Sequence, residues 1–214
     1  MSIKIPFSYL QAAFVASSDA RHEVRFYLCG VAIGGGIVAG TNGHVAVIIE
    51  DDELKDKPQI IIPREVIQWM ERKIKSHLKD NGYVYISEID EPLIKDPVLG
   101  NNHSNVSGKP VLRQGRYIMS HYTSYGHETH EIFTPIDGKF PDVMRVLEPN
   151  IRTESSTASP SFNPDYLNLM IKAKKVLNDS PVQQIRAYFG EPNEAVYFPL
   201  GNENWHGIVM PMRS

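Results

Sequence analysis

Length, composition and charge place this chain among ordinary globular proteins. It has 214 residues, 42% hydrophobic and 22% charged, which is enough to bury a core in one or two domains. The single cysteine, Cys29, excludes an internal disulfide framework, and no apolar run approaches the roughly 18 residues that a transmembrane helix needs. The first ten residues are not typical of a secretory signal. We therefore expect a cytoplasmic protein with no membrane partner.

The chain repeats one order of predicted elements three times: a short apolar strand, a helix that begins at or near a proline, and two or three further strands. In the first repeat, residues 3–5 are strand-like and Pro6 suits the start of a helix. Residues 25–33 and 37–49 then predict strands, and the glycines at 34–36 between them indicate a hairpin.

The second repeat contains the clearest helix. Residues 59–62 predict its strand, and Pro63 starts a helix that places Ile67, Met70, Ile74 and Leu78 on one face. The strands expected after this helix are 83–89, 117–122 and 130–134. The segment 92–115 is rich in Asn, Gly, Ser and Pro and predicts an exposed loop long enough to be functional.

The third repeat follows a segment with the composition of a linker. We expect a helix from Pro164 to Leu177, and strands over 182–189, 195–199 and 207–210. The prediction is thus an α+β fold of three β-α-β-β(-β) units, with helices on one face of antiparallel sheets. Its parts are a two-unit domain at 1–150, a linker at 151–160 and half a domain at 161–214.

Two of the predicted helices carry a basic stripe although the net charge of the chain is -3. Helical spacing places basic and amide side chains on one stripe: Arg64, Gln68, Arg72, Lys75 and Lys79 on the second helix, and Asn168, Lys172 and Lys175 on the third, with Lys174 nearby. One interpretation is a solvated helix face whose lysines favour helix formation. The other is a surface that contacts DNA phosphates without reading the base sequence.

Five short stretches resemble one known family. They are EVRFYLCG (23–30), AGTNGHVA (39–46), QIIIPREV (59–66), DGKFPDVMRVLEP (137–149) and GIVMPMRS (207–214). In this order they are similar to motifs of the bacterial sliding clamp, the beta subunit of DNA polymerase III. The first two units resemble the middle domain of that family, and the third resembles the second half of its last domain. The chain would therefore be a shortened form.

The resemblance implies a hydrophobic pocket that receives a short peptide, with a glutamine and bulky apolar residues, from polymerases and repair proteins. The corresponding residues here are Leu28, Thr41, Gly43, His44, Pro141, Arg145, Val146, Ile208, Met210, Pro211 and Met212. Aliphatic and methionine side chains suit an adaptable apolar pocket. The chain departs from the family pattern at Asn42, Val45 and Ser214, which puts the peptide specificity in doubt.

The function that the resemblance implies is that of a DNA sliding clamp, a processivity factor without enzymatic activity or a cofactor. Such a clamp encircles double-stranded DNA, and its partners are a DNA polymerase and a clamp loader. The family ring has twelve units, so four copies of this three-unit chain would complete it as a homotetramer. The alternative is a clamp-like decoy or regulator that captures clamp-binding peptides without encircling DNA.

The residues give little support for an enzymatic function. His121, His127 and His130 lie near Glu128 and Glu131, but the histidines of HETHE are three residues apart, whereas a zinc-binding HExxH helix needs four. The glycines of the first repeat lack the lysine and the Ser/Thr of a phosphate-binding loop. The lone cysteine lies in an apolar stretch, where packing is a simpler role than nucleophilic chemistry.

Overall fold

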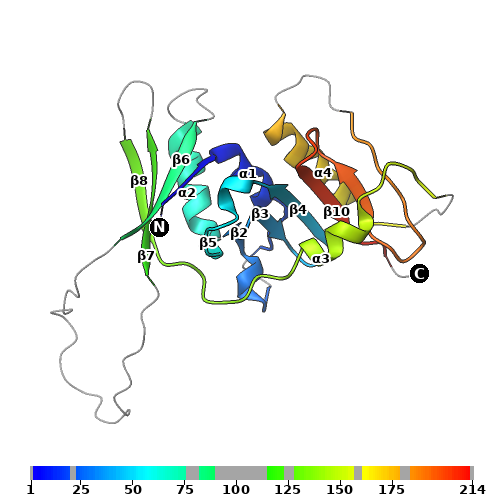
Figure 1. The fold of residues 1–214 in the computed structure, drawn as a ribbon, viewed down its shortest axis with the longest axis horizontal. Helices are drawn as coiled ribbons and strands as arrows, with labels where there is room; N and C mark the ends of the chain where they lie inside the picture. Colours follow the sequence, from blue (N-terminus) through cyan, green and yellow to red (C-terminus); the bar gives the residue numbers. More distant parts are fainter. Residues whose placement is uncertain are drawn as a thin grey trace, which may run out of the picture.

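Over the residues that the structure describes, three helices and eight strands build the first two repeats and their sheets. The structure is a computed structural model that describes residues 2–19, 23–75, 82–89, 115–122, 128–156, 161–178 and 184–212. The first repeat consists of β1 (Ser2–Pro6), α1 (Phe7–Ala16), the 3-10 turn η1 (Phe26–Leu28), β2 (Gly30–Gly34), β3 (Ile37–Thr41), β4 (Val45–Glu50) and the 3-10 turn η2 (Asp52–Leu54). The second consists of β5 (Ile60–Pro63), α2 (Arg64–Lys75), β6 (Tyr83–Ile89), β7 (Arg116–Tyr122), β8 (Glu128–Phe133) and α3 (Met144–Leu147), which η3 (Glu148–Asn150) extends (Figure 1).

The two repeats exchange their first strands. β1 pairs antiparallel with β6 and completes a four-stranded sheet of order β1-β6-β7-β8. β5 pairs antiparallel with β2, so the strands of the first repeat follow the order β5-β2-β3-β4. The repeats are therefore related by an approximate two-fold axis, in which β1 corresponds to β5, β6 to β2 and β8 to β4.

The third repeat extends the second sheet. It consists of α4 (Pro164–Leu177), β9 (Val196–Pro199) and β10 (Trp205–Val209). β10 pairs antiparallel with β4 from Trp205 opposite Ile49 to Val209 opposite Val45, which makes a six-stranded sheet of order β5-β2-β3-β4-β10-β9. The regions 1–150 and 161–212 thus share one continuous sheet.

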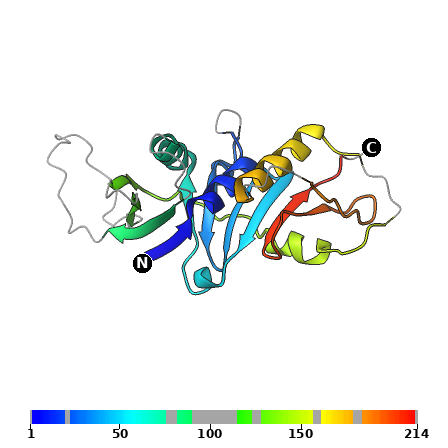
Figure 2. The same cartoon turned by 90° about the horizontal axis from the view of Figure 1, so that it is seen from above.

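One face of the sheets is covered by helices α1, α2 and α4 (Figure 2). α1 lies between the other two helices and packs on β3 and β4. Its Leu10 and Ala13 are fully buried together with Val47 of β4 and Met70 of α2. The helical apolar spacing and the alternation along the strands therefore meet in one core. Within the described ranges, no helix is long and apolar enough to cross a membrane.

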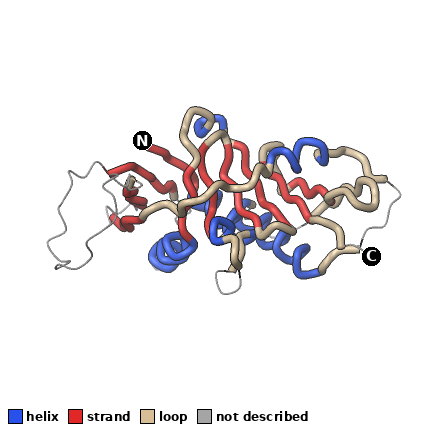
Figure 3. The backbone as a smooth tube through the Cα atoms, turned by 90° about the horizontal axis from the view of Figure 1, so that it is seen from below, coloured by secondary structure: helices blue, strands red, loops and turns tan. Residues whose placement is uncertain are grey.

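The opposite face of the six-stranded sheet is covered by the connector that follows β8, residues 136–150, which includes α3 (Figure 3). Phe140, Val143 and Leu147 of this connector are buried against sheet residues such as Ile48 and Ile208. This second apolar layer fixes the connector across the strands of the first and third repeats.

The α+β fold and most of the predicted elements are confirmed, with α4 at its predicted bounds. The strand predicted at 25–33 is wrong in its first part, because Leu28 and Cys29 donate to Arg25 and Phe26 in a 3-10 turn. The strand predicted at 37–49 is divided into β3 and β4 by a tight turn. The short helix α3 was not predicted.

Two other predictions are only partly covered by the described residues. The strand expected at 182–189 is reduced, within 184–189, to one isolated bridge between Tyr188 and Tyr197. The loop expected at 92–115 lies outside the described residues except for Gly115, and so does Leu78.

Replacing Gly40 with alanine should destabilise the fold, because α1 crosses β3 at this residue. A Cβ atom on Gly40 would lie 1.9 Å from the carbonyl oxygen of Ala13. We expect the free energy of unfolding to fall by about 3 kcal/mol, the upper part of the range for overpacking. Gly35→Ala is the control: its Cβ meets nothing within 4 Å, so only the positive φ of 63° opposes it, at about 1 kcal/mol. Urea denaturation of both variants measures the difference, and equal losses would contradict the close packing.

Candidate functional site

The main candidate site is an apolar cavity of about 220 Å³ beside the joint between the first and third repeats. Four segments of the chain line it: η1 and the residue before it, the β3–β4 turn with the start of β4, the connector, and the end of β10. The lining residues are Arg25, Tyr27, Leu28, Thr41, Gly43, His44, Val45, Ala46, Pro141, Asp142, Val143, Val146, Ile208 and Met210. Segments that are far apart in the sequence therefore share one concave surface.

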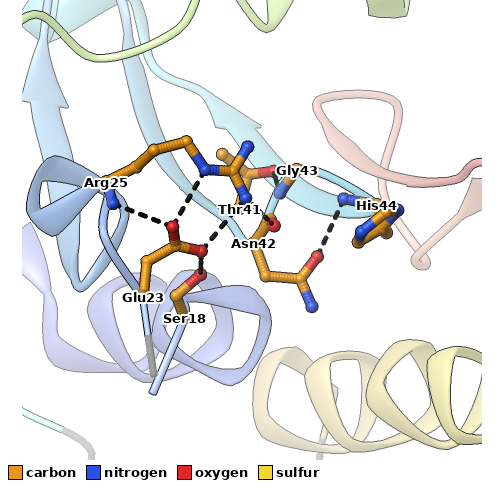
Figure 4. Close-up of polar contacts among 7 residues, drawn as sticks. All are labelled: Ser18, Glu23, Arg25, Thr41, Asn42, Gly43 and His44. Atoms are coloured by element: carbon orange, nitrogen blue, oxygen red, sulfur yellow. Dashed lines mark hydrogen bonds and ion pairs between the residues drawn. The ribbon is translucent and has the colours of Figure 1, made fainter. Parts of the chain in front are cut away.

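The β3–β4 turn is held by its own polar side chains (Figure 4). Asn42 Oδ1 accepts hydrogen bonds from the backbone N–H groups of His44 and Val45, at 2.9 and 3.0 Å. Thr41 Oγ1 donates to the Val45 carbonyl at 2.6 Å and accepts from Gly43 N at 3.0 Å. Gly43 has a φ of 89°, which favours glycine there. The asparagine that departs from the family pattern thus still closes the turn.

An ion pair supports the cavity wall next to this turn. The guanidinium of Arg25 donates to both carboxylate oxygens of Glu23, at 2.9 and 3.0 Å, and reaches the carbonyl of Asn42 at 3.3 Å (Figure 4). Ser18 Oγ donates to the same carboxylate at 3.1 Å. The side-chain and backbone hydrogen bonds from Arg25 hold the pKa of Glu23 at about 2, below its ordinary value of 4.5. The carboxylate therefore orients Arg25 while charged.

The third repeat contributes another wall of the cavity, and two contacts fix this repeat to His44. The backbone N–H of Met210 donates to the His44 carbonyl at 2.8 Å, directly after β10 ends. The imidazole of His44 stacks on the ring of Tyr166 in α4, with centroids 5.8 Å apart and an angle of 11° between the planes. The turn of the first repeat is thus fixed to both the strand and the helix of the third.

Large apolar side chains are exposed around the cavity. Val146 and Met210 line it and are 40% and 36% exposed, and Phe26, between the lining residues Arg25 and Tyr27, is 56% exposed. Met212 lies two residues beyond Met210 and is 58% exposed. Apolar side chains that converge on a cavity with few polar groups are typical of a ligand-binding or peptide-binding site.

The structure brings together eight of the eleven residues that the resemblance assigned to a pocket: Leu28, Thr41, Gly43, His44, Pro141, Val146, Ile208 and Met210. The other three lie outside the lining. Arg145 is exposed on α3, where its backbone N–H donates to Asp142 Oδ1 at 3.1 Å. Pro211 and Met212 follow β10, and the Met212 N–H donates to the Ser161 carbonyl at 2.7 Å.

Six lining residues were not predicted: Arg25, Tyr27, Val45, Ala46, Asp142 and Val143. All of them lie inside the stretches that carry the resemblance, within about three positions of a predicted pocket residue. Their proximity in sequence was the available signal. The 3-10 turn η1 decides that Arg25, Tyr27 and Leu28 all reach the cavity, which a regular strand with alternating side chains would prevent.

The residues predicted to face DNA divide into two groups. Arg72, Asn168, Lys172 and Lys175 are exposed on α2 and α4, and Gln68 is half-buried. Arg64 instead packs its guanidinium 4.5 Å above the Phe14 ring and donates to the Ser18 carbonyl at 3.0 Å, while Lys174 Nζ donates to the Gln184 carbonyl. Lys79 and the side chain of Lys75 lie outside the described residues.

The residues weighed as metal ligands or as a nucleophile do not form one site in the described part of the chain. His121 is buried in β7 and His130 is exposed on β8, and His127 lies outside the described residues. Over the described ranges, no group of three or more His, Cys, Asp or Glu side chains is arranged to hold a metal. Cys29 is buried, and burial raises the pKa of its thiol.

This chain is similar to known proteins in its structure. No family model and no curated protein matches the sequence. The fold matches the DNA polymerase sliding clamp of Pseudomonas aeruginosa, solved with a ligand, with a TM-score of 0.59, 20% identity, and coverage of 100% of this chain and 66% of that one. The clamp of Caulobacter crescentus matches with a TM-score of 0.61, 18% identity, and coverage of 100% and 65%.

A third match is the sliding clamp of Bartonella birtlesii bound to griselimycin, with a TM-score of 0.61, 15% identity, and coverage of 100% and 66%. The chain has the sliding-clamp fold. It spans about two thirds of the length of these solved clamps. The resemblance inferred from the five stretches is thus confirmed for the fold, as a shortened form.

The ion pair of Glu23 should make stability depend on pH. The folded pKa of about 2 lies below the ordinary 4.5, so this carboxylate stabilises the fold above pH 4.5 and the contribution is lost as the pH falls toward 2. Glu23→Gln should therefore be less stable than the wild type near neutral pH, and the difference should shrink in acid. Urea denaturation at several pH values measures it. A difference that stays constant with pH would contradict the assigned pKa.

Proposed function

We propose that this chain is a non-enzymatic clamp protein that holds partner proteins by a short peptide segment bound in the cavity. The observation that carries the proposal is the cavity itself, in which the first repeat, the connector and the third repeat present an apolar surface. In the clamp family, the corresponding surface receives peptides of polymerases and repair proteins. Here the cavity is complete within one chain, so peptide binding needs no second copy.

The chemistry of the lining suits a peptide with bulky apolar residues and one polar anchor. Leu28, Val146 and Ile208 offer aliphatic surface, and Met210 can adapt its shape to the ligand. The polar groups lie at the rim, where the side chain of Arg25 is 48% exposed and held in place by Glu23. A side-chain amide, such as that of a glutamine, can accept a hydrogen bond from this guanidinium.

The helix-covered face is the side that we propose to lie against double-stranded DNA. Arg72, Lys172 and Lys175 are exposed on α2 and α4, which cover the same face of the sheets as α1 (Figure 2). Cations on exposed helices contact phosphates and give binding that is independent of sequence and sensitive to salt. Four copies with three units each would supply the twelve units of a closed ring, which could slide along the DNA that it encloses.

Capture of peptides without DNA is the second candidate function. It is favoured by the completeness of the cavity in a single chain that spans about two thirds of the length of the solved clamps. Such a protein would bind the clamp-binding peptides of other replication proteins. Retention on circular DNA separates the two functions, because an encircling ring stays on a closed circle and slides off after the circle is cut.

A charge placed in the cavity should weaken peptide binding. Val146→Asp puts a carboxylate at an apolar position that lines the cavity, so we expect the dissociation constant of a labelled peptide with a glutamine and bulky apolar residues to rise roughly tenfold or more. Ile151→Asp is the matched control, because Ile151 is 47% exposed and lies outside the lining. Fluorescence anisotropy measures both. Equal affinities for the two variants would contradict binding in this cavity.

Charge reversal on the helices should weaken DNA binding. The triple variant Arg72→Glu, Lys172→Glu and Lys175→Glu should reduce retention on DNA at low salt and flatten the salt dependence, by roughly one unit of log-log slope for each lost phosphate contact. The control reverses Lys55, Lys57 and Lys139. The first two follow η2, the third lies in the connector, and none of them belongs to α1, α2 or α4. Filter binding across a salt series measures both. Equal effects would indicate that only net charge matters.

A further inference from the structure

The side chain of Arg64 connects α2 with the end of α1. Arg64 begins α2 in the second repeat, and its guanidinium carbon lies 4.5 Å from the centroid of the Phe14 ring on α1. Its Nη1 donates to the Ser18 carbonyl at 3.0 Å and to Ser17 Oγ at 3.4 Å. A cation is favourable at this end of a helix, where the backbone carbonyls lack intrahelical partners. Arg64 therefore holds the chain in place where it leaves α1.

Ser18 connects this point with the wall of the cavity. It is buried, with 6% of its surface exposed. Its backbone N–H donates to the carbonyl of Leu28, which lines the cavity, at 2.9 Å, and its Oγ donates to Glu23 at 3.1 Å (Figure 4). The N–H, the hydroxyl and the carbonyl of Ser18 thus all have partners. A buried residue bonded in this way has little freedom to move, so what fixes Ser18 also fixes the groups that it holds.

Arg25 is the cavity residue that depends on this support. Its side chain stands at the rim and is 48% exposed, so without partners it would sample several rotamers, and fixing one of them would weaken binding. The Glu23 carboxylate accepts from its Nε and Nη2 at 2.9 and 3.0 Å. That carboxylate is only 15% exposed and is itself held by Ser18. The direction of the Arg25 guanidinium is therefore set before a peptide arrives.

We propose that Arg64 is a positioning residue for the peptide site, which acts through Ser18 and Glu23 on Arg25. The inference rests on the proposed peptide binding and deepens it, because it names what orients the polar anchor at the rim. Arg64 does not line the cavity, and neither does any other residue of α2. The second repeat would thus contribute to peptide affinity through a helix that the peptide does not contact.

Peptide affinity of the full chain tests this role by a double-mutant cycle. Arg64→Met keeps a long side chain over Phe14 but removes the hydrogen bond to the Ser18 carbonyl. We expect the dissociation constant of a labelled peptide with a glutamine and bulky apolar residues to rise about fivefold, the effect of one hydrogen bond. In an Arg25→Met background, the same change should alter the affinity by at most about twofold, since the residue to be oriented is gone.

Two further variants separate positioning from a general loss of charge or of structure. Lys73→Met is the matched control, because Lys73 is also a cation of α2, with its ammonium 5.5 Å from the centroid of the Trp69 ring, and it should leave the affinity unchanged. Arg64→Lys should restore most of the affinity, because an ammonium can donate to the same carbonyl. Urea denaturation establishes that each variant is folded under the conditions of the assay.

Exchange of the Arg25 Nε–H with water, followed by NMR, tests the positioning without a peptide. This hydrogen is bonded to Glu23 in the wild type, and its signal is assigned by its loss in Arg25→Lys. Arg64→Met should make it exchange several times faster, whereas Lys73→Met should not.

Unchanged exchange in a folded Arg64→Met variant would overturn the proposal. So would effects of Arg64→Met and Arg25→Met on affinity that simply add. A wild-type chain that binds no peptide would instead reject the proposed peptide binding, because the exchange measurement still decides whether Arg64 orients Arg25.

Discussion

The antiparallel pairing of β4 with β10 is the interaction on which the rest of the structure depends. It joins segments about 160 positions apart in the sequence and converts three repeats into one body with a six-stranded sheet. His206 lies buried in this joint, with its Nδ1 3.1 Å from the Tyr197 hydroxyl and its Nε2 3.0 Å from a carboxylate oxygen of Glu50. Burial holds the pKa of His206 below its ordinary value, although Glu50 opposes the shift. The joint is therefore polar at one point and apolar elsewhere.

The candidate site is a consequence of this joint. The turn that ends at His44 belongs to the first repeat, and Met210 belongs to the third, yet their backbones are bonded to each other at 2.8 Å. The connector closes the cavity from the other side because Val143 and Leu147 are anchored in the outer apolar layer. A partner peptide in the cavity would thus contact three parts of the chain that folding has already fixed, which lowers the entropy cost of binding.

The outer edge of the six-stranded sheet is paired within this shortened clamp fold. β9 is the outer strand of the six-stranded sheet, and an open edge invites unwanted pairing. Here Tyr188 pairs with Tyr197 of that strand, and Ser155 and Ser156, from the segment expected to form a linker, bond the backbone of Phe189 beside it. The helix-covered face, with Arg72, Lys172 and Lys175 exposed, is separate from both the cavity and the edges. The proposed peptide binding and the proposed DNA contact would therefore use different surfaces.

The sequence by itself determined the elements with strong periodicity and the residues inside distinctive motifs. The helix at 164–177 and the strand at 83–89 were predicted at their bounds, because capping, apolar spacing and flanking prolines act locally. Eight of the residues that line the cavity had been assigned to a pocket through the family resemblance of these motifs. The sequence did not show that Arg64 would pack on Phe14, or that Tyr27 would reach the cavity.

Only the tertiary structure decided the exchange of β1 and β5, the joint of β4 with β10, and the bridge of Tyr188 with Tyr197 at the β9 edge. Each of these depends on which backbone hydrogen-bonding groups meet after folding. Strand periodicity predicts which face of a strand is buried, but it does not determine with which other strand its backbone hydrogen-bonding groups pair.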